Sequence, residues 1–375
     1  MMAARTALGK RTAAQAAADM ADTAARTAAG TAAQAAGTAR PPGRTRRTAH
    51  ILAVLMAALL LGLTAACDSS GDGSQRDPHE GGQAPEQGRS PFTGLPGKLG
   101  PVLAVKVDNA PGARPPAGLG SPTGPGGADL VFVEQVEGGS SRLLAVYSQR
   151  PPDSVGPVRS ARESDIELLR QFGRPALAYS GVRSALQDDL RRAPLRRLPP
   201  SEVPAAYYRS ENRAAPHNLF LRPADAVRAA PGMSAPRDIG FRFGDAPPGG
   251  EPTARREVRY PAARFTFDWS GEEKRWLVSM DGAAARDAGG ERLGAPTVVV
   301  QEVEVTSSRY RDVTGAVTPY IKTVGSGKAT VLRDGKSYAT EWKRPSDDSG
   351  TAYTLPDGER MAFARGQVWI VYAAR

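Results

Sequence analysis

Two arginines stand three residues apart where a Gly/Pro-containing loop leads into an expected helix. They are Arg159 and Arg162, in the segment Gly156–Arg162 with the sequence GPVRSAR. A helix N-terminus offers partial positive charge and free backbone N–H groups, and guanidinium groups present paired donors that match phosphate and carboxylate oxygens. The segment therefore predicts an anion-binding site, to which we expect Arg114 and Arg142 to contribute from neighbouring loops.

Carboxylates lie close to these arginines along the chain. Asp108 follows an apolar run, Glu134 lies inside another, and Glu137 lies at the mouth of an expected hairpin loop. A carboxylate within an apolar strand needs a partner, and Arg142 or Arg159 is the expected partner of Glu134. The alternative to a ligand site is that Asp108, Glu134 and Glu137 neutralise the arginines internally.

His217 is the one histidine beyond residue 100, and it lies in the segment Ala215–Phe220 beside Asn218. An imidazole near neutral pH suits general acid–base catalysis, although a satisfied loop histidine is the alternative. The candidate catalytic residues are Asp108, Glu134 and His217. The expected ligand-binding set is Arg114, Glu137, Arg142, Arg159, Arg162 and Asn218.

Several kinds of chemistry are excluded by composition and spacing. One cysteine rules out an internal disulfide and a CxxC redox pair, and three histidines leave little room for a zinc site, so no metal or cofactor is expected. The segment Gly325–Lys328 lacks the spacing of a phosphate loop, and there is no GxSxG elbow or dinucleotide fingerprint.

The elements that must position the candidate residues follow from periodicity. Strands are expected at 102–107, 130–136, 143–147 and 176–179, with the second and third joined as a hairpin, and helices at 160–172, 182–190 and 223–228. Ser160 and Glu163 form a capping-box pattern for the first helix. Beyond residue 250, short strands separated by turns predict a β-meander.

The predicted fold class is therefore α+β, with an N-terminal α/β layered domain followed by a β-rich C-terminal domain. We expect a leader at 1–66, a flexible tether at 67–95, the α/β domain at 96–246 and the β-rich domain at 253–375. The tether is rich in Gly, Pro and polar residues, which is typical of a flexible linker.

The N-terminal segment has the form of a lipoprotein signal. A basic stretch ending at Arg47 precedes the uncharged run Ile51–Ala66, which is shorter than the roughly 20 residues of a membrane-spanning helix. The only cysteine, Cys67, follows it directly, in a sequence that resembles a bacterial lipobox, whose cysteine carries the lipid. We expect lipidation of Cys67 and anchoring of the chain at the extracytoplasmic face of the cell membrane.

Charge gives no reason to expect a nucleic-acid partner. The chain of 375 residues has a net charge of +10, but residues 1–66 carry eight basic and two acidic side chains and so account for +6 of it. The Ala-rich residues 1–36 are either a long basic region of the signal or the product of a start codon placed too far upstream. The remainder is close to neutral for its size.

From residue 102 onward the chain resembles the YerB-like lipoproteins, a bacterial family of unknown function. The matching stretches are Val107–Asn109, Ala113–Pro115, Ala128–Val131, Val136–Gly139, Gly156–Arg162, Ala215–Leu219, Val324–Lys328, Glu341–Lys343 and Gly366–Trp369. The resemblance implies a lipoprotein signal and covers both expected domains. It implies no activity.

The sequence leads to one functional hypothesis and two alternatives. The hypothesis is a membrane-anchored extracytoplasmic lipoprotein that binds an anionic cell-wall or lipid-pyrophosphate ligand through its arginines. The first alternative is an envelope glycopolymer phosphotransferase or hydrolase, so enzyme activity stays open, and the second is a protein-interaction scaffold. The sequence does not determine the oligomeric state.

Overall fold

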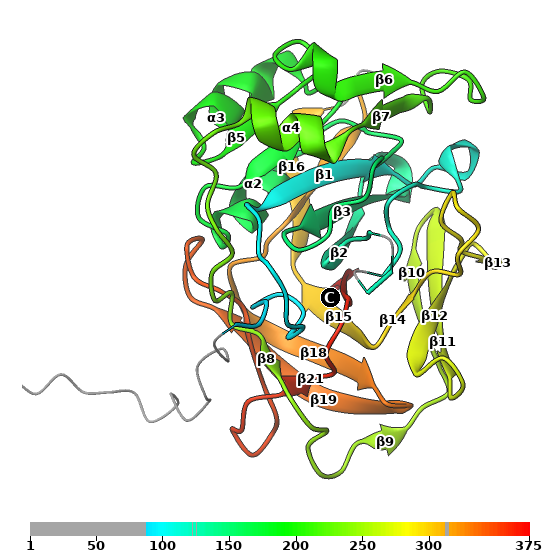
Figure 1. Ribbon diagram of the computed structural model, residues 1–375. Coiled ribbons are helices and arrows are strands. Elements are labelled where there is room, and N and C mark those ends of the chain that lie inside the picture. Colours follow the sequence, from blue (N-terminus) through cyan, green and yellow to red (C-terminus); the bar gives the residue numbers. More distant parts are fainter. Residues whose placement is uncertain (1–87, 122, 125, 312–314) are drawn as a thin grey trace, which may run out of the picture. The chain divides into compact units, whose positions relative to one another are not determined.

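The computed structural model describes residues 88–121, 123–124, 126–311 and 315–375 (Figure 1). The leader, Cys67 and most of the expected tether lie outside the described residues. Eleven strands form the main sheet, in the order β20 (Ala352–Thr354), β19 (Lys336–Arg344), β18 (Gly325–Arg333), β15 (Thr297–Val303), β22 (Val368–Ala374), β2 (Leu130–Gln135), β3 (Ser141–Tyr147), β1 (Leu103–Asp108), β4 (Ala176–Ala178) and β5 (Arg196–Leu198), with β9 (Glu251–Pro252) paired to β19.

Smaller sheets and short helices complete the fold. The small sheet consists of β10 (Arg255–Tyr260), β11 (Ala263–Ser270), β12 (Arg275–Met280), β13 (Ala283–Ala284) and β14 (Gly294–Ala295). Three two-stranded sheets pair β16 (Val305–Arg311) with β17 (Val317–Ile321), β21 (Ala362–Phe363) with β8 (Arg242–Phe243), and β6 (Tyr207–Arg209) with β7 (Leu219–Leu221). The helices are α2 (Glu163–Arg170), α3 (Gln187–Arg192) and α4 (Pro223–Ala229), with 3₁₀ turns η1 (Pro111–Ala113), η2 (Glu137–Gly139), η3 (Ser184–Leu186) and η4 (Pro204–Ala206).

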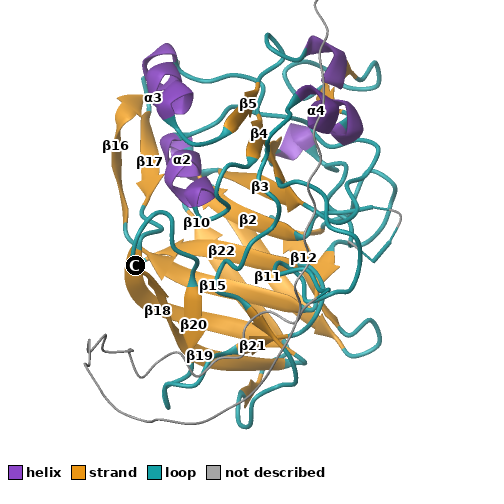
Figure 2. Ribbon diagram, turned by 60° about the vertical axis from the view of Figure 1, so that its left-hand side comes forward, coloured by secondary structure: helices purple, strands orange, loops and turns teal. Residues whose placement is uncertain are grey.

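The central strands of the main sheet are buried on both faces, which explains their almost continuous apolar sequences. On one face, Leu168, Leu169 and Phe172 of the α2 region pack against Phe132 and Leu144 (Figure 2). On the other face, residues of the small sheet and of α4 pack against the same strands. The structure is thus a strand-rich α+β fold with mixed sheets, while the layered arrangement of an N-terminal domain stays a prediction.

The strand β22 connects the N-terminal and C-terminal regions of the described residues within the main sheet. β22 runs parallel to both β2 and β15 and lies between them, so that Trp369 pairs with Val131 on one side and Val298 on the other. Strands from both expected domains therefore share one sheet, and the expected boundaries at 96–246 and 253–375 remain a prediction. The expected C-terminal meander is wrong, because its strands divide between the main and small sheets and β22 is parallel to its neighbours.

Two helix predictions need correction. The capping box expected from Ser160 is wrong, because the N-cap of α2 is Arg162, whose backbone N–H donates to Asp165 Oδ2 at 2.6 Å. Asp165 holds this position because its other oxygen is bound by Lys106 of β1. The helix expected at 182–190 begins later, as the turn η3 followed by α3, which ends at Arg192.

None of the described helices is long and apolar enough to cross a bilayer. This finding concerns residues 88–375 with their short gaps, and the apolar run 51–66 lies outside them.

Asp129 is a buried carboxylate at the start of β2. Its Oδ2 accepts hydrogen bonds from the backbone N–H and the hydroxyl of Ser148, both at 2.6 Å, while no described residue bonds to Oδ1. Burial raises the pKa of Asp129 to about 6, although the bonds from Ser148 oppose the shift. The folded state therefore holds a proton on Asp129 over a pH range in which the unfolded chain has released it.

This raised pKa predicts a pH-dependent effect of Asp129→Asn. As pH rises from 4 to 7, Asp129 loses its proton in the unfolded chain at a lower pH than in the folded protein, and this stabilises the unfolded state. The contribution of Asp129 to the free energy of unfolding of wild type therefore falls by up to about 3 kcal/mol. The substituted side chain has no proton to lose, so the difference in free energy of unfolding between the variant and wild type should shift by that amount in favour of the Asp129→Asn variant between pH 4 and pH 7. Urea unfolding at several pH values measures the difference, and a difference that does not change with pH would contradict the assignment.

Candidate functional site

Three charged side chains form a row across the ends of three strands. Asp108 of β1 pairs in register with Arg142 of β3, which pairs in turn with Glu134 of β2. Directly paired residues of antiparallel strands point to the same face. The row therefore lies on the face that α2 covers, close to the start of that helix.

A buried ion network lies beneath the row. The Lys106 ammonium group is fully buried and contacts the carboxylate of Glu134 and, at 2.7 Å, Oδ1 of Asp165. Burial raises the pKa of Glu134, and the nearby negative charge of Asp165 adds to the rise, while Lys106 opposes it. Glu134 is thus bound to Lys106, and the expectation that Arg142 or Arg159 would be its partner is wrong.

Asp108 brings together two residues that are distant in sequence. Its Oδ2 lies 2.8 Å from Nδ1 of His217 and 2.9 Å from Nε of Arg159. Its Oδ1 accepts a bond from the backbone N–H of Ala110. Asp108 is only 4% exposed, whereas Arg159 and His217 are 28% and 25% exposed. The buried Asp108 carboxylate therefore binds both Arg159 and His217, and part of each of these side chains stays accessible to solvent.

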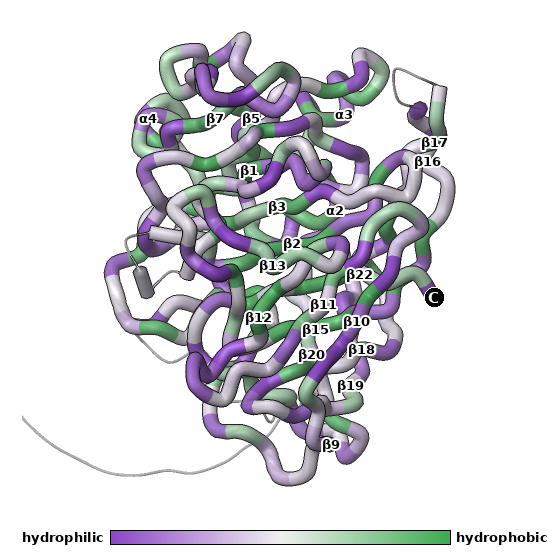
Figure 3. The backbone as a smooth tube through the Cα atoms, turned by 90° about the vertical axis from the view of Figure 1, so that its right-hand side faces the viewer, coloured by the Kyte–Doolittle hydropathy of each residue, from purple (hydrophilic) through white to green (hydrophobic). Residues whose placement is uncertain are grey.

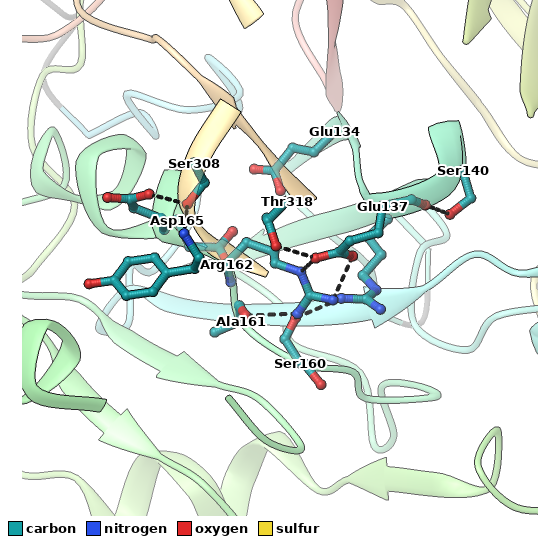
Figure 4. Close-up of polar contacts among 12 residues, drawn as sticks. Glu134, Glu137, Ser140, Ser160, Ala161, Arg162, Asp165, Ser308 and Thr318 are labelled. Carbon is teal, nitrogen blue, oxygen red and sulfur yellow. Dashed lines mark hydrogen bonds and ion pairs between the residues drawn. The ribbon is translucent and has the colours of Figure 1, made fainter. Parts of the chain in front are cut away.

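Arg162 is fixed by Glu137 (Figure 4). Its Nη2 donates to Oε2 of Glu137 at 2.7 Å and its Nε forms an ion-pair contact with Oε1 at 2.6 Å, while the Thr318 hydroxyl donates to Oε1 at 2.6 Å. Burial alone would raise the pKa of Glu137, but the hydrogen bonds and positive charge of Arg162 hold it below its usual range. Glu137 is therefore ionised at neutral pH, and Arg162 is oriented by it.

Arg142 differs from its neighbours, because no described carboxylate lies within ion-pair distance of it. Its Nη1 donates a hydrogen bond to the backbone carbonyl of Ser160, at 3.3 Å. Burial lowers the pKa of Arg142 to about 10, and the positive charges of Arg162 and Arg159 add to the decrease, while Glu137 and Asp108 oppose it. Arg142 and Arg162 donate to the same Ser160 carbonyl, and Arg159 directly precedes Ser160, so these three arginines lie close together, and we call them the arginine cluster.

Arg114 lies beside this cluster. Its guanidinium donates to Oδ1 and the backbone carbonyl of Asn109, at 3.1 and 3.0 Å, and forms an ion pair with Asp281 at 2.8 Å. Asn218, also expected in the site, accepts a bond from Arg209 through its side-chain oxygen. None of the described contacts joins Asn218 to the arginine cluster.

Some residues around the site were missed by sequence reasoning. Arg213 donates to the carbonyls of Ala113 and Pro115 and so holds the loop that carries Arg114. Lys106, Asp165, Asp281 and Thr318 also contact candidate residues. Only one of them has a signal in the sequence. Lys106 lies in the otherwise apolar run 102–107, and a lysine buried there needs a carboxylate partner.

The arrangement can attract an anion and can move a proton. Three guanidinium groups lie together here; Asp108 and Glu137 pair with two of them, while Arg142 forms an ion pair with no described carboxylate. The pair of His217 and Asp108 has the geometry of a general base whose tautomer is fixed by a carboxylate. Among the described residues no group of three or more His, Cys, Asp or Glu side chains is placed to hold a metal ion.

Comparison with known proteins assigns the family. Residues 92–235 match the N-terminal domain, and residues 256–370 the C-terminal domain, of a protein family described as being of unknown function, DUF3048. The chain belongs to the DUF3048 family. The arginine cluster lies within the N-terminal match, while Asp281 and Thr318 lie within the C-terminal one.

One similar protein is known both by sequence and by structure. "Putative lipoprotein YerB" of Bacillus subtilis (strain 168) is 24% identical over 278 residues, which cover 72% of this chain and 80% of that protein. The crystal structure of Bacillus subtilis YerB matches with a TM-score of 0.64 at 22% identity, over 76% of this chain and 96% of that one. This likeness shows that the two proteins share a fold.

The buried network predicts a large effect of Lys106→Met. Removal of the ammonium group leaves Glu134 and Asp165 as uncompensated buried carboxylates, which should lower the free energy of unfolding by about 3–5 kcal/mol. The control is Lys322→Met, because Lys322 forms a half-exposed pair with Glu304 and should change stability by less than about 1 kcal/mol. Urea unfolding of both variants provides the comparison.

The double variant Lys106→Met with Glu134→Gln refines this test. If the two groups act as one unit, the second change should recover part of the loss, which a double-mutant cycle measures as coupling. Strictly additive losses would show that the pair does not stabilise the fold as described.

Proposed function

We propose that this protein is a membrane-anchored extracytoplasmic lipoprotein that binds an anionic cell-envelope ligand through the arginine cluster. The anchoring part is supported by the lipobox-like sequence at Cys67 and by the name of the Bacillus subtilis relative, a lipoprotein. The binding part is supported by the geometry around Arg142.

The observation that carries the binding proposal is that the Arg142 guanidinium forms an ion pair with no described carboxylate. A partly buried guanidinium beside two others, bonded to a carbonyl oxygen and to no described carboxylate, is electrostatically unfavourable by itself. A phosphate or carboxylate bound there would offset the repulsion and accept paired hydrogen bonds. Asp108 and Glu137 hold Arg159 and Arg162 in place, so an anion would meet donors that are already oriented.

This proposal predicts that Arg142→Gln weakens binding of pyrophosphate by about tenfold to a hundredfold, since a hydrogen bond between charged groups contributes about 1.5–3 kcal/mol. Isothermal titration calorimetry with the soluble chain from residue 68 measures the affinity. Arg228→Gln is the matched control, because Arg228 is exposed on α4 and pairs with Asp225. The proposal fails if wild type binds no pyrophosphate, or if both variants bind like wild type.

A second candidate function is hydrolysis of a phosphate ester, and the contact between His217 and Asp108 favours it. These residues are 109 positions apart in sequence, and Arg159 bonds to the same carboxylate oxygen as His217. In such a reaction Nε2 of His217 would take a proton from water, the water oxygen would attack phosphorus, and the departing alkoxide would take a proton from solvent. Arg159 would stabilise the added negative charge.

The enzyme candidate predicts that the protein cleaves bis-p-nitrophenyl phosphate or a lipid-linked glycan phosphate. Asp108→Asn and His217→Gln should each lower kcat by at least about a hundredfold. The Glu163→Gln variant, altered at the first residue of α2, is the control. Absence of turnover in wild type, or turnover that His217→Gln preserves, would exclude this activity.

A further inference from the structure

The contacts of Arg114 lead from the arginine cluster to the small sheet. Asn109, which Arg114 binds, is the neighbour of Asp108, and Asp281, its ion-pair partner, directly follows β12. Asp281 is tied in turn to Arg264 of β11, since its Oδ1 accepts from the Arg264 backbone N–H at 2.7 Å and its own N–H donates to the Arg264 carbonyl at 2.8 Å. Each step of this path is a direct contact.

A second contact fixes the hairpin of β10 and β11 beside the site. The backbone N–H of Ala262, in the hairpin turn, donates to the carbonyl of Gly139 at 2.9 Å. Gly139 has a φ of 72°, and a Cβ there would lie 2.4 Å from Pro261, so only glycine allows this close approach. Gly139 belongs to the same turn as Glu137, which orients Arg162. The hairpin, whose strands β10 and β11 are labelled in Figure 3, is thus connected to the site through Asp281 and through Gly139.

This hairpin carries two arginines that face each other. Arg259 of β10 and Arg264 of β11 are directly paired in register, and like charges in such positions destabilise a sheet. Glu257 forms ion pairs with both arginines: its Oε1 lies 2.5 Å from Nη2 of Arg259 and its Oε2 lies 3.8 Å from Nε of Arg264. Arg259 is 69% exposed and Arg264 is 39% exposed. With Asp281, Tyr260 and Pro261 they line a cavity of about 250 Å³.

We propose that the arginine cluster and the hairpin form one basic track that binds a linear polyanion with repeated phosphate groups. The track consists of Arg142, Arg159, Arg162, Arg114, Arg264 and Arg259. Four carboxylates contact these six arginines, namely Asp108, Glu137, Asp281 and Glu257. This inference rests on the proposed function and specifies its ligand as an extended chain in place of a single small anion.

The physical reason for an extended ligand is the spacing of the charge. The cluster binds one end through partly buried, oriented donors, while the hairpin offers more exposed guanidinium groups on a different sheet. A small anion can occupy only one of these places. A phosphate chain that is long enough to reach both the arginine cluster and the hairpin makes its second contact intramolecularly, at a high effective concentration. Its affinity should therefore rise with chain length until the cluster and the hairpin are both occupied.

The test compares pyrophosphate with inorganic polyphosphates of increasing defined length by calorimetry. Wild type should gain at least about tenfold in affinity from the shortest to the longer chains. Arg259→Gln with Arg264→Gln should remove this gain and leave pyrophosphate binding unchanged, because neither residue touches the cluster. Arg142→Gln should weaken binding of every length.

The matched control is Arg191→Gln with Arg228→Gln, which removes the same number of exposed, ion-paired arginines from α3 and α4. It should bind every length as wild type does. A hairpin variant that keeps the gain with length, or a control that loses it equally, would overturn the track. If wild type binds no pyrophosphate, or Arg142→Gln leaves its binding unchanged, the proposed function itself fails.

The source of the phosphate chain is distinguished by a second probe. A poly(glycerol phosphate) chain has the same repeated charge on a phosphodiester backbone as a wall polymer, whereas polyphosphate has anhydride links. Binding of either that depends on Arg259 and Arg264 supports the track, and the tighter ligand identifies the natural backbone. Thermal unfolding of each variant checks that the fold is retained, which is expected because Arg259 is largely exposed and Arg264 is partly exposed.

Discussion

The buried contact of Lys106 with Glu134 and Asp165 is the constraint on which the site depends. It joins β1, β2 and α2 through one ammonium group that has no access to water. A charge in that position is stable only while its partners remain, so the three elements are held in one arrangement. Asp165 transmits the constraint further, because its second oxygen binds the backbone of Arg162 and so fixes where α2 begins. Glu137 can then orient the Arg162 guanidinium.

The position of β22 is the second constraint. The strand that ends the chain lies between β2 and β15, so the part of the sheet that carries Glu134 and Arg142 is completed by the C-terminal sequence. The regions matched by the two DUF3048 domains share this sheet, and their side chains also meet at the site, where Thr318 binds Glu137 and Asp281 binds Arg114. The C-terminal region therefore contributes to the site as well as to the sheet.

The local elements could be predicted from sequence, but the contacts between them could not. The hairpin of β2 and β3 follows from two largely apolar runs joined by a short Gly/Ser-containing loop, and the helix after GPVRSAR follows from helical spacing. Both signals depend on neighbouring residues alone. The start of α2 was misplaced because its cap depends on Asp165, whose position is set by a lysine 59 residues away. The contact of His217 with Asp108 spans 109 residues, and no local pattern encodes it.

The carboxylates around the arginines have a role that goes beyond neutralisation. Arg159 and Arg162 each bond to one acid, yet both remain close enough to Arg142 for their charges to lower its pKa. An arginine without an oriented partner would rotate freely, and ordering it on binding would cost conformational entropy. Asp108 and Glu137 already hold Arg159 and Arg162 in place before an anion binds, and Arg142, which forms an ion pair with no described carboxylate, is left to attract it. Within the cluster, Arg159 and Arg162 thus provide donors that are already oriented, while Arg142 provides the positive charge, unpaired among the described residues, that attracts an anion.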